Sequence, residues 1–597
     1  MFFLFLPVIA ACVLFFATCL KRKTPVFAIG FACLAGAFAR VGAMSLKNVF
    51  QGKVYARKIM PFLTLNGVEY EWGFSFTRTE LVLASFVLFV ALLSLVFAKS
   101  YLQPEKINRY TMFLCALAFC VLTCIGSDNF FQFFAGWELS VLFAYLLLLL
   151  FFERQSVRQA GNRFFVCHVL SDIPLFCAFY ILMCKTGSFF VPPFVPVDSV
   201  SFTPDQAMAF AVLALVGLSV KLMLFASPLP LTETAEMCIP ALSFVATAAL
   251  GGLGIYALYN AYAFFAGFKA VRIVLCAVGV LTAASGIVAA LCRDDFKNVL
   301  TGMLSSQFGL VLTVFGLAGR DAGFCAYIAL MLPMSGLILS AGTVIYALRA
   351  QENITRMGGL SARLPALFWI MGLLSLCCVG FPAIGTFGVW QDLYAALYVK
   401  GNFGFASGFA VLSFGLAWAF ARMLYDVFFA PRRMMLSAVD ELRPVGAGLL
   451  APVAIVLIAA LCQEKIFEQS VLDDLSRSKA LAVLALSLVG CSGLCFGLLY
   501  FKRCKHEQPF GKKAEAFAGM LSLAPLYQVL IVRPCLSFAR ALWFSVGTEV
   551  WLEKFPRAVQ RLAQNIQKRQ NGRLSSFFAA VLVGLFLLTA ALIGMKG

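Results

Sequence analysis

Residues 129–150 read NFFQFFAGWELSVLFAYLLLLL, and this stretch decides the class of fold. A helix that crosses the hydrocarbon core of a bilayer needs about 20 consecutive, mostly apolar residues. The stretch has that length, and Glu138 is its one charged residue. It therefore predicts a transmembrane helix that carries a single ionisable group into the membrane.

The rest of the chain has the same character. Of its 597 residues, 62% are apolar and 13% are charged, and the mean hydropathy is +0.92. Soluble globular proteins are about half apolar and about a quarter charged. The composition predicts an all-α integral membrane protein with about sixteen transmembrane helices. The apolar runs are roughly 2–20, 25–46, 79–100, 110–127, 129–152, 161–185, 206–228, 238–262, 271–292, 298–318, 323–348, 365–398, 403–430, 446–463, 480–501 and 574–595.

Basic residues gather in the short connections between these runs, so the net charge of +19 does not indicate a nucleic-acid partner. The positive-inside rule places the basic connections on the electrically negative side of the membrane. We call that side the basic face. The connections follow odd-numbered runs and hold Lys21, Arg22, Lys23, Lys106, Arg109, Arg154, Arg158, Arg293, Lys297, Arg349, Arg356, Arg432, Arg433, Lys502, Arg503, Lys505, Lys512 and Lys513.

The connection between the second and third runs is an exception, because it follows an even-numbered run and is also basic, with Lys47, Lys53 and Lys58. Its segment LTLNGVEYEWGFSF predicts a β-hairpin with Asn66-Gly67 as the turn.

Two runs are predicted to be broken helices. Residues 365–398 are too long for one simple span, and the run 206–228 ends against a pair of prolines. Backbone groups freed by a break need a polar or hydrated setting, so broken helices are common at transport sites. The helix-breaking residues are Gly380, Pro382, Gly385, Gly388, Pro228 and Pro230.

Residues 515–572 mix apolar and basic residues and predict a long amphipathic lateral helix in the plane of the membrane, kinked at its prolines. At 1.5 Å per residue it could reach roughly 80 Å, which exceeds the width of one helix bundle. That length favours a strap across neighbouring subunits, and the alternative is a connector packed on its own domain. A terminal anchor helix is expected at 573–597.

Several ionisable side chains fall inside predicted spans. Each costs about 2.5–3.5 kcal/mol to insert at the centre of a membrane, so each is a functional candidate. Arg422 and Asp426 are four residues apart and can pair on one helical face. The full set is Glu138, Asp172, Lys221, Asp392, Arg422 and Asp426.

Glu138 and Lys221 would form a useful pair within one bundle. Burial disfavours the charged form of either group, and a neighbouring opposite charge favours it. A movement that joins or separates them would therefore change their affinity for a proton. The alternative is a static ion pair that holds helices together.

Three neutral or weakly charged candidates accompany these groups. His168 lies one turn from Asp172, which either tunes the same site or fixes helix packing. Ser306 and Gln307 either line a water path or form hydrogen bonds between helices.

The twenty cysteines include no C-x-x-C pattern, and with only two histidines the chain is not expected to hold a metal, an iron–sulfur cluster or a haem.

The sequence around these residues resembles the antiporter-like subunits of respiratory complex I, most closely subunit 5 of NADH–quinone oxidoreductase, over nearly the whole chain. The matching motifs are SDNFFQFFAGWELSVLFAYLL with Glu138, RFFVCHVLSD with Asp172, KLMLFASPLPLTETAEMCIPALS with Lys221, Glu236 and Pro240, DDFKNVLTGMLSSQFG with Asp295, Lys297, Ser305, Ser306, Gln307 and Gly309, RMGGL at 356–360, GFPAIGTF at 380–387 and the tail QKRQNGRLSSFFAAVLVG.

The resemblance implies two inverted five-helix repeats with broken helices, each forming half of a proton path. It implies proton pumping coupled to NADH:ubiquinone electron transfer, with NADH, FMN, iron–sulfur clusters and ubiquinone bound by partner subunits and no cofactor in this chain. Implied partners are other membrane-arm subunits, especially the neighbouring antiporter-like one, and membrane lipids including cardiolipin. The mitochondrial inner membrane is the expected location, with the bacterial plasma membrane as the alternative.

The resemblance also implies how the chain is divided. The implied parts are 1–109, with three helices and the hairpin; 110–262 and 263–430, the two repeats; 431–514, with two further spans; 515–572, the lateral helix; and 573–597, the anchor.

The chain departs from the family pattern at four positions, three of them in the second repeat. Ala246 and Leu330 stand where the family usually has histidine, and Met334 and Gln391 stand where it usually has lysine. Asp392 and a water chain past Gln307 could replace this basic relay, or the second half-path could be altered or closed. Two other functions therefore stay open: a cation/proton antiporter subunit, and a structural subunit that does not pump.

Overall fold

The structure of the protein is a computed structural model. It describes residues 5–19, 25–51, 54–65, 68–187, 202–224, 233–264, 266–381, 403–431, 442–463 and 477–503, together with short stretches within 384–398 and 529–565. The chain divides into two units, Met1–Leu523 and Ala524–Gly597.

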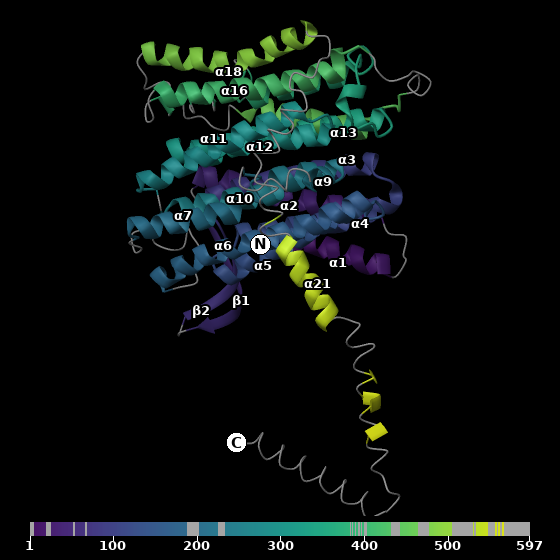
Figure 1. Ribbon diagram of the computed structural model, residues 1–597, viewed down its shortest axis with the longest axis vertical. Coiled ribbons are helices and arrows are strands. Elements are labelled where there is room, and N and C mark those ends of the chain that lie inside the picture. The colour runs from purple at the N-terminus through teal and green to yellow at the C-terminus, as the bar shows by residue number, and fades with distance from the viewer. Residues whose placement is uncertain are drawn as a thin grey trace, which may run out of the picture. The chain divides into compact units, whose positions relative to one another are not determined.

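The first unit is a bundle of helices that lie nearly side by side, with one β-hairpin at its end (Figure 1). Its earlier elements are α1 Leu6–Cys19, α2 Val26–Gln51, β1 Tyr55–Leu65, β2 Val68–Phe76, α3 Arg78–Tyr101, α4 Pro104–Ile125, α5 Phe130–Leu148, α6 Gln155–Thr186, α7 Pro204–Leu218, α9 Ile239–Phe244, the π-turn η4 Val245–Ala249 and α10 Leu250–Tyr262. Its later elements are α11 Lys269–Cys292, α12 Phe296–Ala318, α13 Arg320–Ala347, the short η5 Ile354–Arg356, α14 Pro365–Val379, α16 Phe403–Leu424, the π-turn η6 Tyr425–Phe429, α17 Ala447–Leu461 and α18 Arg477–Arg503.

Eleven helices in the described part are long and apolar enough to cross a membrane, and four shorter apolar helices accompany them. The chain is therefore a multi-pass helical membrane protein, as its composition predicted. A described helix lies in every predicted run except 574–595, which is outside the described residues. The total of sixteen spans stays a prediction.

The predicted hairpin is confirmed. Strands β1 and β2 pair antiparallel from Tyr55 opposite Phe76 to Leu65 opposite Val68, and the turn residues 66–67 lie outside the described part. The hairpin is fixed to the bundle by backbone hydrogen bonds, since the Gly73 amide donates to Gln132 Oε1 (3.0 Å) and the Ser75 amide donates to the Gly126 carbonyl (2.8 Å).

Both predicted breaks exist, but the first comes earlier than expected. Helix α7 already ends at Leu218, ahead of the proline pair, which lies outside the described residues. The chain then turns through Met223, whose φ of 49° is left-handed. The freed carbonyl of Met223 accepts a hydrogen bond from Ser305 Oγ of α12 (2.7 Å), which satisfies it within the protein. Lys221 therefore lies in the interruption and not within a regular helix.

The second break follows α14 at Gly380. Its φ is 72°, and a Cβ there would come within 2.1 Å of the Trp390 ring. Only glycine suits a left-handed residue that is also packed this closely. Much of 382–402 lies outside the described residues, Asp392 included.

In the second unit, the described part of the predicted lateral helix is α21, Arg533–Val546, which carries large exposed apolar side chains together with its arginines. Its continuous course to residue 572 and the terminal anchor at 573–597 fall outside the described residues and stay predictions.

Helices α11 and α12 meet backbone to backbone through glycines. A Cβ on Gly286 would lie 2.5 Å from the Ser306 amide nitrogen, and one on Gly309 would lie 2.3 Å from that of Ala283. Small residues at such contacts let helices pack closely where no hydrophobic effect drives their association. This contact sets the position of Ser306 and Gln307 in the bundle.

We expect the Gly309→Ala variant to be less stable by about 1–3 kcal/mol, because the added methyl group must push the two helices apart. The matched control is Gly372→Ala in α14, where nothing lies within 4 Å of an added Cβ and the better helix propensity of alanine should keep or raise stability. Unfolding of the purified chain in mixed detergent–SDS micelles measures both. Equal effects of the two changes would contradict the close contact.

Candidate functional site

A buried ion pair lies at the interruption of α7. The Nζ atom of Lys221 is 3.0 Å from Oδ1 of Asp172, which comes from the middle of α6. The two side chains are 0% and 3% exposed. Attraction between opposite charges is strong where water is excluded, so removing either group would leave the other as an unpaired buried charge.

Trp137 of α5 contacts both members of this pair. Its Nε1–H donates to Asp172 Oδ1 (2.8 Å), and Lys221 Nζ lies 4.1 Å from the centroid of its ring. The second contact is a cation–π interaction, which strengthens when the cation is desolvated. Asp172 Oδ2 makes no hydrogen bond to any described residue. Trp137 was missed as a site residue, although the family motif that places Glu138 includes it.

Among the described residues the salt-bridge partner of Lys221 is Asp172 and not Glu138, and the predicted exchange of protons between Glu138 and Lys221 stays a prediction. Successive residues on a helix point about 100° apart, and on α5 it is Trp137 that turns fully inward. Glu138 is half-buried beside it and interacts electrostatically with both Asp172 and Lys221. The site is thus a triad of two carboxyl groups and one amine.

His168 lies at the edge of the triad. Its ring is 1% exposed, and Nδ1 lies 2.8 Å from the Phe164 carbonyl one turn earlier on α6. A carbonyl can only accept, so Nδ1 carries the hydrogen and Nε2 is left to serve as the acceptor of a neutral imidazole. His168 is within electrostatic range of Lys221 but does not bond to Asp172, so its orientation is set by its own helix.

Ser306 and Gln307 are fully buried in α12. Ser306 Oγ and both amide atoms of Gln307 have no partner with normal hydrogen-bond geometry among the described residues, and the Cys378 thiol of α14 is a weak hydrogen-bonding neighbour of Gln307. An unpaired buried polar group costs about 1–3 kcal/mol. Neither side chain forms a strong hydrogen bond between the described helices, which favours the alternative that they line a water path.

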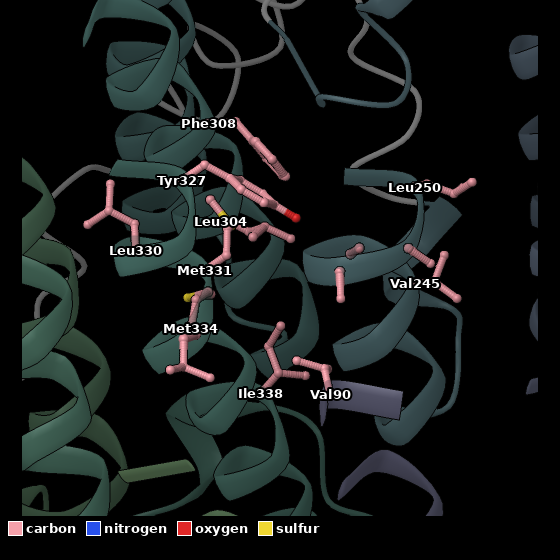
Figure 2. Packing of buried hydrophobic residues seen from close by; sticks show 14 of the residues in the cluster. Val90, Val245, Leu250, Leu304, Phe308, Tyr327, Leu330, Met331, Met334 and Ile338 are labelled. Carbon is pink, nitrogen blue, oxygen red and sulfur yellow. The ribbon is translucent and has the colours of Figure 1, made fainter. Parts of the chain in front are cut away.

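The positions of the missing basic relay lie in an apolar layer. Ala246, Leu330 and Met334 are at most 2% exposed. Figure 2 shows Leu330 and Met334 among apolar side chains of α12 and α13, close to the π-turn η4. The polar atom of Tyr327 in this layer is occupied, because its hydroxyl donates to the Thr247 carbonyl (2.6 Å). No ionisable relay therefore replaces the expected one at these positions.

Arg422 has closer partners than the predicted Asp426. Its Nε is 3.5 Å from Asp426 Oδ2, whereas its Nη2 is 2.8 Å from Asp294 Oδ1. Its Nη1 also donates to the carbonyls of Ala290 (3.2 Å) and Leu291 (2.5 Å) at the end of α11. A cation that satisfies the last carbonyls of a helix is a structural clamp. Arg422 and Asp426 thus hold α11 and α16 together.

Glu236 lies outside the triad, near the basic face, where Ser156 Oγ donates to its Oε2 (3.2 Å). The more deeply buried carboxylate in this segment is Glu233, which was not predicted; its Oε1 is 3.3 Å from Arg163 Nε and its side chain is 3% exposed.

Burial raises the pKa of Asp295, which caps α12 by accepting from the Asn298 amide (3.0 Å). Within the described residues, no group of three His, Cys, Asp or Glu side chains could hold a metal ion.

Comparison with known proteins assigns the central segment of the chain. Residues 127–414 match the family described as NADH:quinone oxidoreductase/Mrp antiporter, TM. The chain is 25% identical over 392 residues to NADH-ubiquinone oxidoreductase chain 5 of Arabidopsis thaliana, which covers 63% of this chain and 58% of that protein. It is 24% identical over 444 residues to NADH-quinone oxidoreductase subunit L of Mycobacterium tuberculosis, covering 72% and 69%. The resemblance to antiporter-like complex I subunits is confirmed.

The chain spans less than two thirds of the length of the first of these relatives. A solved structure, the Mrp complex from Dietzia sp. DQ12-45-1b, contains a chain of the same fold, with a TM-score of 0.65 and 16% identity over 85% of this chain and 99% of that one. This likeness concerns the fold alone, and chemistry has to be argued from the site.

We expect Trp137→Phe to destabilise the protein by about 1.5–3 kcal/mol, because the ring remains while the hydrogen bond to the charged Asp172 is lost. Trp369→Phe is the matched control, since Trp369 is 65% exposed on the outside of the bundle. The free energy of unfolding in mixed detergent–SDS micelles measures the difference. Equal stability of the two variants would show that Trp137 does not support the ion pair.

Proposed function

Because residues 127–414 match the family described as NADH:quinone oxidoreductase/Mrp antiporter, TM, we propose that this chain carries protons across a bioenergetic membrane as an antiporter-like membrane-arm subunit of a complex of the NADH–quinone oxidoreductase type. The observation that carries the proposal is the Lys221–Asp172 ion pair, buried at an interrupted helix. Ionisable groups are retained inside a membrane where they serve transport, and interrupted helices are where transporters place them.

The triad supports a simple loading and release step. With Lys221 against Asp172 and the face of Trp137, the protonated amine is stabilised and holds its proton. A movement of the interrupted segment that takes Lys221 away from Asp172 removes this stabilisation, so the amine releases its proton. Glu138 is half-buried next to the pair and offers a second carboxylate that can take up or pass on the proton.

The second half of the path is proposed to work without a basic relay. The apolar layer around Leu330 and Met334 offers no proton carrier. Ser306 and Gln307 have unpaired buried polar atoms that can bind water, and we infer that protons pass them along a water chain. Asp392 remains the proposed ionisable group of this half, from sequence alone.

The remaining assignments follow from the relatives. We infer that NADH, FMN, iron–sulfur clusters and ubiquinone are bound by partner subunits, that the neighbouring antiporter-like subunit is the closest partner, and that the lateral helix reaches it. Cardiolipin is the proposed lipid partner. The mitochondrial inner membrane is the inferred location, and the bacterial plasma membrane is the alternative, since relatives of both kinds are similar.

The second candidate function is cation/proton antiport. The family description and the shared fold with the Mrp complex favour it. The two functions differ in their ions, because an antiporter needs sodium or another cation on the opposite side of the membrane. The third function, a structural subunit that does not transport, would leave the triad without effect on transport.

We expect Lys221→Met to abolish proton transport and to cost about 3–5 kcal/mol of stability, because Asp172 is left charged and unpaired. The Lys221→Met/Asp172→Asn double variant should regain most of that stability without regaining transport, since a neutral pair has no buried charge. NADH-driven acidification of membrane vesicles and unfolding in mixed micelles measure the two effects. Lys185→Met, at an exposed lysine of α6, is the control.

Each outcome selects one function. Transport that persists in Lys221→Met at the control rate would support the structural subunit and contradict the proposal. Transport that appears only with added sodium would support the antiporter.

We expect Gln307→Leu to slow proton transport several-fold while leaving stability equal or higher. The change keeps the volume of the side chain and removes an unpaired polar group, which is favourable for folding. The control is Gln132→Leu in α5, a buried amide whose Oε1 already accepts from the Gly73 amide (3.0 Å), so its loss should lower stability. Unchanged transport in Gln307→Leu would place the proton path elsewhere.

A further inference from the structure

We propose that a hollow at the basic face of the bundle binds a phosphate group. The hollow has a volume of about 210 Å³ and is separate from the triad. Its polar lining includes Gln103, Arg154, Glu236, Lys297, Glu352 and Arg443. We call it the basic hollow.

Four membrane-spanning helices begin at the wall of the basic hollow. Gln103 is the N-cap of α4, Arg154 is the N-cap of α6, Cys238 precedes the span Ile239–Tyr262, and Lys297 lies in the first turn of α12. The first turn of a helix carries the positive end of the helix dipole. In α12 the Phe296 and Asn298 amides already donate to the Glu352 carbonyl and to Asp295, so that helix contributes through its dipole. The convergence of the four helix N-termini makes the hollow electropositive before any side chain is counted.

Of the positively charged side chains in the hollow, two guanidinium groups can contact an anion. Lys297 Nζ is paired with Glu352 Oε1 at 3.0 Å, so these two charges offset each other. Arg154 lies over the ring of Phe151, with Cζ 5.7 Å from the centroid, and Arg443 lies over that of Tyr346 at 5.5 Å. Neither arginine has a carboxylate within salt-bridge distance among the described residues.

Glu236 is the negatively charged side chain that opposes the two arginines in the basic hollow. The one hydrogen bond to its carboxylate from a described residue comes from Ser156 Oγ (3.2 Å), and the carboxylate forms no salt bridge with a described residue. Among the described residues, two arginines without a salt bridge and four helix N-termini therefore face one carboxylate that is not paired with a lysine, so the described lining of the hollow keeps a positive surplus.

The position of the arginines suits capture of an anion from the membrane surface. Arg154 and Arg443 are exposed at the rim, while Lys297 at the floor is 8% exposed. A guanidinium forms paired hydrogen bonds with phosphate oxygens, and basic clusters on this side of a membrane attract anionic headgroups. The ligand class is a phosphate ester or inorganic phosphate, supplied either by a lipid headgroup or by solution.

The test uses the full-length chain, delipidated in detergent. Binding of phosphatidylglycerol in mixed micelles and of inorganic phosphate is titrated separately. The Arg154→Ala/Arg443→Ala variant should bind at least about tenfold more weakly, because each guanidinium offers charge-assisted hydrogen bonds. The matched control, Arg109→Ala/Arg356→Ala, removes the same charge from two exposed arginines of the basic face that do not line the hollow.

Binding of the lipid alone would identify a headgroup site, and binding of both probes would identify a site for free phosphate as well. Equal affinity of the two double variants, or no binding of either probe, would overturn the proposal.

A second variant keeps the test decisive if the arginine changes disturb folding. Glu236→Gln removes the carboxylate that has no salt bridge and can keep the hydrogen bond from Ser156. The same probes should then bind more tightly than to the unaltered chain. Unchanged or weaker binding in a folded Glu236→Gln variant would contradict a phosphate in the basic hollow.

Discussion

The cost of burying charge in a medium without water governs this structure. Lys221 and Asp172 tolerate that medium because each neutralises the other and Trp137 supports both, by a hydrogen bond to the carboxylate and by its ring face to the amine. Such a pair is a weak source of stability, because the desolvation of two ions offsets most of their attraction. In the proposed function, this mutual stabilisation is gained or lost when the interrupted segment moves. The arrangement contributes little to stability, and its proposed role is in transport.

The same constraint explains how the helices are interrupted. Backbone groups freed inside a membrane must find partners within the protein. The Met223 carbonyl accepts a hydrogen bond from Ser305 Oγ. In the turn after α14, Gly380 has a left-handed φ and packs against Trp390. In each run of five helices starting at α4 and at α11, the interrupted helix is the fourth and a π-turn lies in the fifth. Five spans carry the chain to the opposite side, so the second run begins from the other face of the membrane.

The two halves of the bundle nevertheless differ in chemistry. The first half concentrates its ionisable groups in one triad. In the described part of the second half, the corresponding region is apolar around Leu330 and Met334, and the neutral side chains of Ser306 and Gln307 are buried there without a strong hydrogen bond. The surviving charges there, Arg422 with Asp294 and Asp426, clamp the end of α11. A proton that crossed this half would depend on bound water more than on side-chain carriers, which makes the first half the natural place for control.

The sequence by itself determined the membrane class, the runs that became helices, the hairpin and the short set of residues that could act inside the bilayer. Hydropathy over twenty residues and the cost of an intramembrane charge are local properties, so they can be read without knowing which helices touch. The tertiary structure alone decided the pairings. Lys221 forms its salt bridge with Asp172 and not with Glu138. Helix α7 ends at Leu218, so Lys221 lies in the interruption, and on α5 the fully buried side chain is that of Trp137 and not that of Glu138. The tertiary structure also places Arg422 in a salt bridge with Asp294 and brings four helix N-termini to the basic hollow. Distances between groups far apart in sequence follow from how helices pack, and no local pattern in the chain encodes them.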